Sequence, residues 1–270
     1  MSANLAPPIT LLTDFGMQDT YVAEMHGVIA GLAPNVRVID LTHAILPQNI
    51  RQGALALADA VEAFPDGTIH VAVVDPGVGS RRRAVAAEIG RWRFVGPDNG
   101  LLTGVLRRWP RQRVVSLTNP QFFRAAVSRT FHGRDIFAPV AAHWAAGVAL
   151  DAFGNPLETP LIQLDWPSPT RGDHCLTGQV LAIDHFGNLL TDLTVDLLST
   201  HVPSGAASVT VLVGEQCVGP IVGAYSERPG QLLALVGSHG RLEIAVESGS
   251  AAKQLQLGVG ATVVVQWSHS

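Results

Sequence analysis

The sequence contains very little cysteine and lysine. Its two cysteines, Cys175 and Cys217, form neither a disulfide framework nor a CxxC metal pair, and Lys253 is the single lysine. So little cysteine fits a reducing, cytoplasmic compartment. The longest basic run covers only residues 81–83, and the net charge is -4. We therefore expect a cytoplasmic protein whose main partner is not nucleic acid.

Long apolar runs and the common cofactor motifs are missing too. No run approaches the roughly 20 apolar residues of a membrane helix. The first residues, MSANLAPPITLL, lack the charged start and long apolar core of a signal peptide. The chain has no H-E-x-x-H zinc motif, no G-x-S-x-G elbow, no P-loop and no dinucleotide fingerprint. We therefore expect no membrane span and no metal or nucleotide cofactor.

The apolar pattern divides the 270 residues into two domains. Over residues 1–153, short apolar runs alternate with segments of helical periodicity, which predicts an α/β domain with a mostly parallel sheet. Four prolines interrupt residues 154–173, which we interpret as a linker. Residues 174–270 carry short apolar runs with no room for helices between them, which predicts a small antiparallel β-barrel or sandwich.

The expected elements follow from this pattern. Strands are predicted at residues 9–13, 36–41, 69–74, 84–89, 92–95 and 114–117, and in the second domain at 180–184, 189–191, 209–213, 233–236, 242–246 and 262–266. Helices are predicted at residues 19–32, 49–64 and 136–146.

The stretch around Asp75 has the strongest chemical character. The predicted strand 69–74 ends in this carboxylate, and Pro76 and Gly77 then let the chain turn toward three arginines. Open α/β sheets place ligand-binding groups at the carboxyl ends of their strands. A structural ion pair between Asp75 and Arg82 is an equally good interpretation of these two residues alone. His132, at a helix entry, adds a third polar group, and the three together favour a catalytic site.

Other candidates follow strands in the same way. Asp14 follows the strand 9–13 and could accept hydrogen bonds from a vicinal diol, although Asp-Phe-Gly is also ordinary turn chemistry. Asp19 could cap the next helix or bind an ammonium group. In the second domain, Phe186 could stack on a base and Asn188 could pair with an adenine edge, or both could belong to a hairpin turn. Ser238 could hold a carboxylate or likewise form a turn.

Six segments together resemble the S-adenosyl-L-methionine (SAM) hydroxide adenosyltransferase family, the SAM hydrolases related to fluorinase and chlorinase. They are LLTDFGMQDTYVAEMHGVI, VVDPGVGSRRRAV, FVGPDNGLL, TFHGRDIFAPVAAH, IDHFGNLLTDL and SHGRLEIAV, and they span nearly the whole chain in order. The resemblance implies an N-terminal α/β domain, a C-terminal β-barrel, and a homotrimer with sites at subunit interfaces. It also implies hydrolysis of SAM to adenosine and L-methionine, without a metal or other cofactor.

The resemblance assigns roles to residues of this chain. Asp75, Arg82 and His132 would activate water, and Asp14 would hold the ribose diol. Adenine and methionine would be bound by a larger set, Asp19, Gln48, Asp184, Phe186, Asn188, Ser238, His239, Val246 and Ser248.

Three positions depart from the fluorinase-like pattern. His239 stands where that branch has arginine, Gln48 where it has an aromatic residue, and Tyr21 where it has a small hydroxyl residue.

Two alternatives remain open on the sequence. One is a SAM-dependent halogenase or a related dehalogenase. The fluorinase-like pattern has tyrosine where this chain has Asp75, and a carboxylate there disfavours a halide and favours water. The other alternative is a non-catalytic adenosine or SAM sensor. A sensor would keep Asp14, Phe186 and Asn188 but would not need Asp75, Arg82 and His132.

Overall fold

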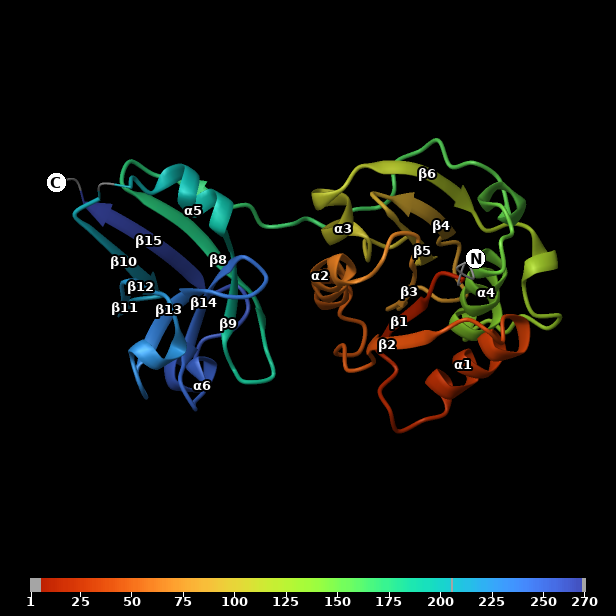
Figure 1. Cartoon of the computed structure of the whole chain (residues 1–270), viewed down its shortest axis with the longest axis horizontal. Coiled ribbons are helices and arrows are strands. Elements are labelled where there is room, and N and C mark those ends of the chain that lie inside the picture. The colour runs from red at the N-terminus through yellow and green to blue at the C-terminus, as the bar shows by residue number, and fades with distance from the viewer. Residues whose placement is uncertain (1–5, 205, 269–270) are drawn as a thin grey trace, which may run out of the picture. The chain divides into compact units, whose positions relative to one another are not determined.

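The computed structural model describes residues 6–204 and 206–268. The chain forms two compact units, one ending at Asp165 and the other beginning at Trp166 (Figure 1). None of the helices in the described part of the chain has the length and apolar character needed to cross a membrane.

The first unit is built on a six-stranded sheet with the order β2-β1-β3-β5-β4-β6. The first four strands in this order run parallel, whereas β4 is antiparallel to both of its neighbours. The predicted α/β unit with a mostly parallel sheet is confirmed. The strands are β1 (Ile9–Thr13), β2 (Val38–Thr42), β3 (Ile69–Val73), β4 (Ala84–Ile89), β5 (Trp92–Pro97) and β6 (Arg111–Ser116).

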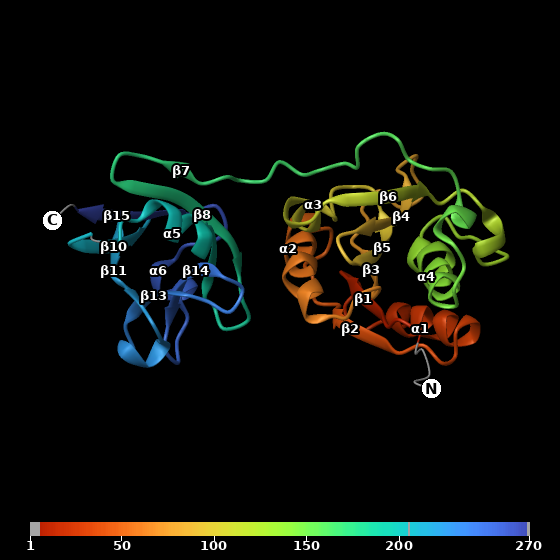
Figure 2. The same cartoon turned by 45° about the horizontal axis from the view of Figure 1, so that its top comes forward.

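Helices cover both faces of this sheet (Figure 2). α1 (Tyr21–Leu32) and α4 (Ala138–Ala145) cover one face, and α2 (Ile50–Ala60) and α3 (Thr103–Arg108) cover the other. Every residue of β1 and β3 is buried, as expected for central strands of a sheet with helices on both faces. Alternate residues of these strands therefore enter two separate cores, and the loops at the strand ends are left to form a site.

Two predicted helices differ from the observed ones. The segment 49–64 forms α2 and then a 3₁₀ turn, Val61–Ala63. The segment predicted as a helix from residue 136 begins earlier, with a π-helical turn at Gly133–Phe137 that leads into α4. π-Helical turns often occur at functional sites, and this one begins immediately after His132.

The second unit is a nine-stranded, nearly closed barrel. Its order is β11-β10-β15-β8-β9-β14-β13-β12, with β7 pairing with β8, and β11 near one end contacts β13 near the other. All pairs are antiparallel except β12 with β13. The predicted antiparallel β-barrel is confirmed. The strands are β7 (Thr170–Arg171), β8 (Cys175–Ile183), β9 (Leu189–Thr194), β10 (Ser208–Val213), β11 (Gln216–Gly219), β12 (Ile221–Val222), β13 (Leu232–Val236), β14 (Arg241–Val246) and β15 (Thr262–Ser268).

The prediction that this unit lacks room for helices is wrong. Two short helices, α5 (Val195–His201) and α6 (Ala251–Leu255), lie between its strands. Their first turns are capped by hydroxyl side chains: Thr194 accepts a hydrogen bond from the Leu197 amide, and Ser250 accepts one from the Lys253 amide. Helices of one or two turns carry too few residues for an apolar period to be visible in the sequence.

Candidate active site

Asp75, Arg82 and His132 form one hydrogen-bonded cluster at the carboxyl end of the parallel strands. Asp75 lies two residues beyond β3, Arg82 lies in the loop between β3 and β4, and His132 directly precedes the π-helical turn. Arg82 Nε donates to both Asp75 oxygens at 3.0 Å, and Nη2 donates to Oδ2 at 2.5 Å. The same Nη2 donates to His132 Nδ1 at 2.8 Å. The Arg82 guanidinium thus links Asp75 to His132, so the three side chains that the sequence suggests for water activation form one cluster.

A glycine allows the Arg82 loop to approach His132. Gly79 has φ +77°, and a Cβ at this position would lie 2.4 Å from the backbone oxygen of Arg129. The loop therefore packs directly against the segment that leads to His132. Ser80 Oγ accepts a hydrogen bond from the Arg82 amide at 3.2 Å and fixes the backbone from which the guanidinium extends.

His132 is held as a neutral imidazole of defined tautomer. Burial lowers its pKa, and the positive charge of Arg82 lowers it further, against smaller opposing effects of Asp75 and Asp135. Because Arg82 donates to Nδ1, the proton of the neutral ring lies on Nε2. His132 can therefore donate a hydrogen bond from Nε2, while its Nδ1 lone pair is already engaged.

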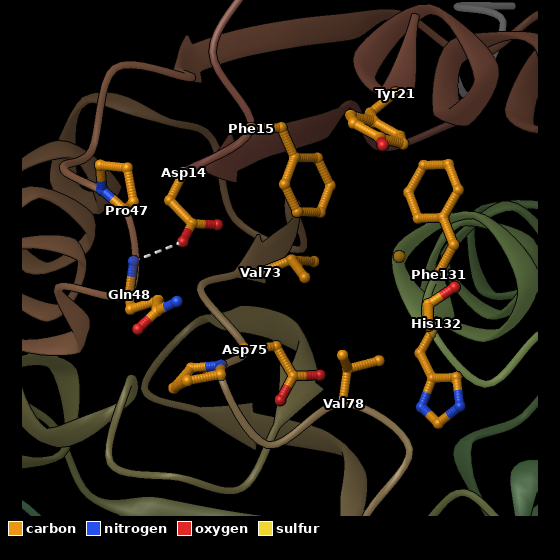
Figure 3. A pocket seen from close by; sticks show the side chains of 13 residues that line it. Asp14, Phe15, Tyr21, Pro47, Gln48, Val73, Asp75, Val78, Phe131 and His132 are labelled. Atoms are coloured by element: carbon orange, nitrogen blue, oxygen red, sulfur yellow. Dashed lines mark hydrogen bonds between the residues drawn. The ribbon is translucent and has the colours of Figure 1, made fainter. Parts of the chain in front are cut away.

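Two members of the cluster, Asp75 and His132, line a pocket of about 410 Å³ in the first unit (Figure 3). Four predicted site residues line it: Asp14, Gln48, Asp75 and His132. Asp19 is exposed and is not among the lining residues. The pocket is thus bounded by four separate parts of the chain, all at one edge of the sheet.

Asp14 is oriented by the neighbouring loop. The Gln48 amide donates to Asp14 Oδ2 at 2.7 Å, and Gln48 adopts a left-handed conformation with φ 65°. The Gly16 amide donates to the backbone oxygen of His43 at 2.9 Å, which ties the same two loops together again. These bonds hold the Asp14 carboxylate at the pocket wall.

Three aromatic side chains in the pocket wall were not predicted as site residues. Phe15, Tyr21 and Phe131 all line the pocket. The sequence carried a signal for each of them: Phe15 follows Asp14, Phe131 precedes His132, and Tyr21 stands where the fluorinase-like pattern has a small hydroxyl residue. An aromatic residue beside a candidate polar residue is too common in buried segments to have been decisive.

The second unit carries a pocket of its own, of about 560 Å³. Phe186, Asn188, Val246 and Ser248, all predicted as substrate-binding, line it together with Tyr225. Phe186 is 72% exposed, and its ring contacts His185 at an interplanar angle of 76° with 5.7 Å between ring centroids, so most of the ring is accessible to a flat ligand. Sequence reasoning missed Tyr225 because no nearby motif marks it.

Asp184 shapes the loop that carries two of these residues. Its Oδ1 accepts hydrogen bonds from the amides of Phe186 at 2.9 Å and Asn188 at 2.8 Å, and its Oδ2 accepts one from Asn188 Nδ2 at 2.8 Å. Gly187 takes φ +90° within this turn. The Asp184 carboxylate therefore fixes the orientation of Phe186 and Asn188.

Ser238 and His239 lie in the turn between β13 and β14, outside the lining of this pocket. The nearby Glu243 is buried and accepts a hydrogen bond from Tyr225 Oη at 2.7 Å. Burial raises the pKa of Glu243 and the charge of Asp184 adds to this, while the Tyr225 bond and the charge of His239 oppose it. The side chains of Glu243, Tyr225, Asp184 and His239 therefore interact electrostatically. Nothing in the sequence marked Glu243 as a site residue.

Models of two protein-family domains match this chain. The model of the SAM hydroxide adenosyltransferase N-terminal domain matches residues 9–154, and that of the C-terminal domain matches residues 178–264.

Proteins similar over nearly the full length include two named (R)-S-adenosyl-L-methionine hydrolase. The protein from Salinispora tropica is 42% identical over 94% of this chain and 95% of its own, and that from Thermus thermophilus is 40% identical over 95% and 98%. A fluorinase from Nocardia brasiliensis is 28% identical over 96% and 97%. The crystal structure of an uncharacterized conserved protein from Thermotoga maritima matches with a TM-score of 0.89 at 35% identity, over 96% and 99%. The chain belongs to the SAM hydroxide adenosyltransferase family.

Proposed function

We propose that this protein hydrolyses SAM to adenosine and L-methionine by attack of water at C5′. The observation that carries the proposal is the Asp75–Arg82–His132 cluster beside the pocket of the first unit. Two relatives that are 42% and 40% identical over nearly the whole chain are named (R)-S-adenosyl-L-methionine hydrolase, which supports this reaction type.

The leaving group of this reaction needs no protonation by the enzyme. Water oxygen attacks C5′ opposite the sulfonium, and the C5′–O bond forms as the C5′–S bond breaks. The electron pair of the broken bond stays on sulfur, which leaves as the neutral thioether of methionine. One proton of the water must be removed. Because the departing group is already activated and neutral, positioning of the water is the enzyme's main task, and we propose that no metal or other cofactor takes part.

We assign different tasks to the three side chains. Arg82 donates to His132 Nδ1, so neither ring nitrogen of neutral His132 offers a free lone pair. We therefore assign proton acceptance to the Asp75 carboxylate, which lines the pocket. The Nε2–H of His132 would donate to one lone pair of the water and direct the other at C5′. Arg82 would hold both partners in position and offset the negative charge.

A halide is a poor alternative nucleophile in this pocket. A halide would lose its hydration shell beside the Asp75 carboxylate, which repels it. The Nε and Nη2 donors of Arg82 are already engaged by Asp75 and His132. We therefore propose hydrolysis rather than the halogenation performed by the more distant fluorinase relatives.

The remaining predicted contacts divide between the two pockets. In the first unit, Asp14 would hold the ribose diol, with Gln48 beside it and Asp19 for the methionine amino group. In the second unit, Phe186 and Asn188 would contact adenine. The methionine end and the surrounding wall would come from Asp184, Ser238, His239, Val246 and Ser248. We propose a cytoplasmic homotrimer in which the first-unit pocket of one subunit meets the second-unit pocket of its neighbour. Each unit carries one of the two pockets that hold predicted contacts, so a complete site needs both kinds of unit.

The proposal is tested by incubating the purified protein with SAM, with and without excess chloride, and separating the products by chromatography. We expect adenosine and methionine in equal amounts and no effect of chloride. Asp75→Asn should lower kcat by at least about a hundredfold. Asp66→Asn is the matched control, because the Asp66 side chain is 74% exposed and lies outside the pocket. A 5′-chloro-5′-deoxyadenosine product, or tight SAM binding with no product, would contradict the proposal.

A further inference from the structure

Three aromatic rings from separate segments meet at the pocket of the first unit. Phe15 follows β1, Tyr21 is the first residue of α1, and Phe131 precedes His132. Their ring centroids lie 5.9 Å (Phe15–Tyr21), 5.7 Å (Phe15–Phe131) and 5.1 Å (Tyr21–Phe131) apart. The corresponding planes are inclined by 60°, 80° and 85°. The rings therefore form a three-sided corner, which we call the aromatic corner, and all three line the pocket (Figure 3).

Phe131 belongs to the hydrophobic core of the first unit and Phe15 packs against it, but Tyr21 is not part of that core. Tyr21 is 46% exposed, although a ring of this size gains stability mainly when it is buried. One ring already binds a cation: the Arg134 guanidinium carbon lies 4.9 Å from the centroid of Phe131. Arg134 is paired with both Asp135 and Glu24, so its charge is compensated locally. Phe15 and Tyr21 are the rings left to make most of the contact with a ligand.

The charges around the pocket favour a cation there. Asp14 and Asp75 both line it. Arg82 compensates Asp75, whereas the hydrogen bond to Asp14 comes from the neutral amide of Gln48. A positively charged ligand group would thus lie between the Asp14 carboxylate and the electron-rich ring faces.

A trialkyl sulfonium is the kind of cation such a corner recognises. It carries a permanent positive charge but has no N–H or O–H, so it cannot be bound by donated hydrogen bonds. Aromatic faces attract cations of this type through the ring quadrupole, as they do quaternary ammonium groups. Carboxylates contribute longer-range attraction.

We propose that the aromatic corner is a sulfonium subsite that recognises the charged sulfur of the substrate. This inference rests on the proposed function, because it identifies the sulfonium of SAM as the ligand. Cleavage of the C5′–S bond removes the positive charge from sulfur, so the attraction ends when methionine is formed. The attraction is strongest in the ground state, and its loss therefore raises KM more than it changes kcat.

The test compares two variants of Tyr21 with two ligands. Tyr21→Leu removes the ring but keeps apolar bulk, and Tyr21→Phe removes only the hydroxyl. KM and kcat are measured with SAM. The inhibition constant is measured with S-adenosyl-L-homocysteine, the neutral thioether that lacks the sulfonium charge. Because Tyr21 is exposed, both variants should fold, and circular dichroism checks this.

For Tyr21→Leu we expect a rise of about fivefold in KM for SAM, a smaller change in kcat, and an inhibition constant for the thioether within about twofold of the wild-type value. Tyr21→Phe should keep the wild-type ratio of SAM to thioether affinity. Equal weakening of both ligands would overturn the inference and leave an apolar wall, and so would an unchanged KM. Loss of SAM preference in Tyr21→Phe would point to the hydroxyl instead.

Failure of the proposed function would be seen separately. A wild-type protein that forms no adenosine from SAM refutes hydrolysis, whatever the variants do. The aromatic corner is then tested by calorimetric dissociation constants of SAM and the thioether for the same three proteins. The same selective loss for SAM in Tyr21→Leu supports the subsite, and its absence overturns it.

Discussion

Removing one partner of the Asp75–Arg82 ion pair should destabilise the protein more than removing both. The two side chains are only 5% and 10% exposed, and the guanidinium makes three short contacts with the carboxylate. Arg82→Met keeps most of the side-chain stem but leaves the buried Asp75 carboxylate without its cationic partner. Asp75→Leu leaves the buried Arg82 guanidinium without its anionic partner. Each single variant should therefore lower the free energy of unfolding by about 3 kcal/mol.

The double variant should be more stable than either single variant. It replaces two desolvated charges by apolar side chains of similar size, a change that is often close to neutral. A double-mutant cycle measured by urea unfolding gives the coupling free energy between the two positions. The unfolding transition of the first unit is followed by the fluorescence of Trp92, Trp109 and Trp144, which all lie in that unit.

A second measurement in the same proteins tests the electrostatics. Arg82 lowers the pKa of His132, so Arg82→Met should raise that pKa in an NMR titration of the imidazole. If the losses of unfolding free energy in the two single variants add up to the loss in the double variant within about 0.5 kcal/mol, the idea of a buried, coupled pair is refuted. An unmoved pKa of His132 would refute its contact with the guanidinium.

Two further predictions concern the scaffold of the first unit. Gly79→Ala should lower the free energy of unfolding by roughly 3 kcal/mol, because a Cβ adds a clash with the Arg129 backbone oxygen to the strain of positive φ. Gly67→Ala, with the same φ of +77° and nothing within 4 Å, should cost only about 1 kcal/mol, and equal losses in urea unfolding would contradict the clash. Burial lowers the pKa of His70 to about 3, so the folded state keeps this ring neutral while the unfolded state binds a proton below pH 6.5. Stability should therefore fall as pH falls from 6.5 toward 3, with up to roughly 1.4 kcal/mol per pH unit due to His70. His70→Asn keeps a polar partner for Thr10 and should show a shallower loss; parallel pH profiles of the two proteins would refute the assignment.

The position of the candidate site followed from local sequence patterns and one rule of topology. Asp14 and Asp75 each end a fully apolar or nearly apolar strand, and β1 and β3 turn out to be neighbouring parallel strands. Their carboxyl ends therefore meet at one edge of the sheet, and both carboxylates line the same pocket. Such a prediction works because the strand ends are set by local turn residues.

Features that depend on tertiary contacts could not be predicted in the same way. Tyr225 reaches Glu243 from 18 residues away, and only the pairing of the barrel strands brings them together. The aromatic corner likewise joins three segments that are separated in the sequence. The helices α5 and α6 were missed for a different reason, since one or two turns leave no readable period.

The source of the oxygen in the product tests the central claim most directly. SAM is incubated with the enzyme in water enriched in ¹⁸O, and the adenosine is analysed by mass spectrometry with fragmentation of the ribose. Attack of water at C5′ predicts one ¹⁸O atom at the 5′ position of adenosine and none in methionine. Unlabelled adenosine, or label in the methionine portion, would contradict displacement at C5′ by water.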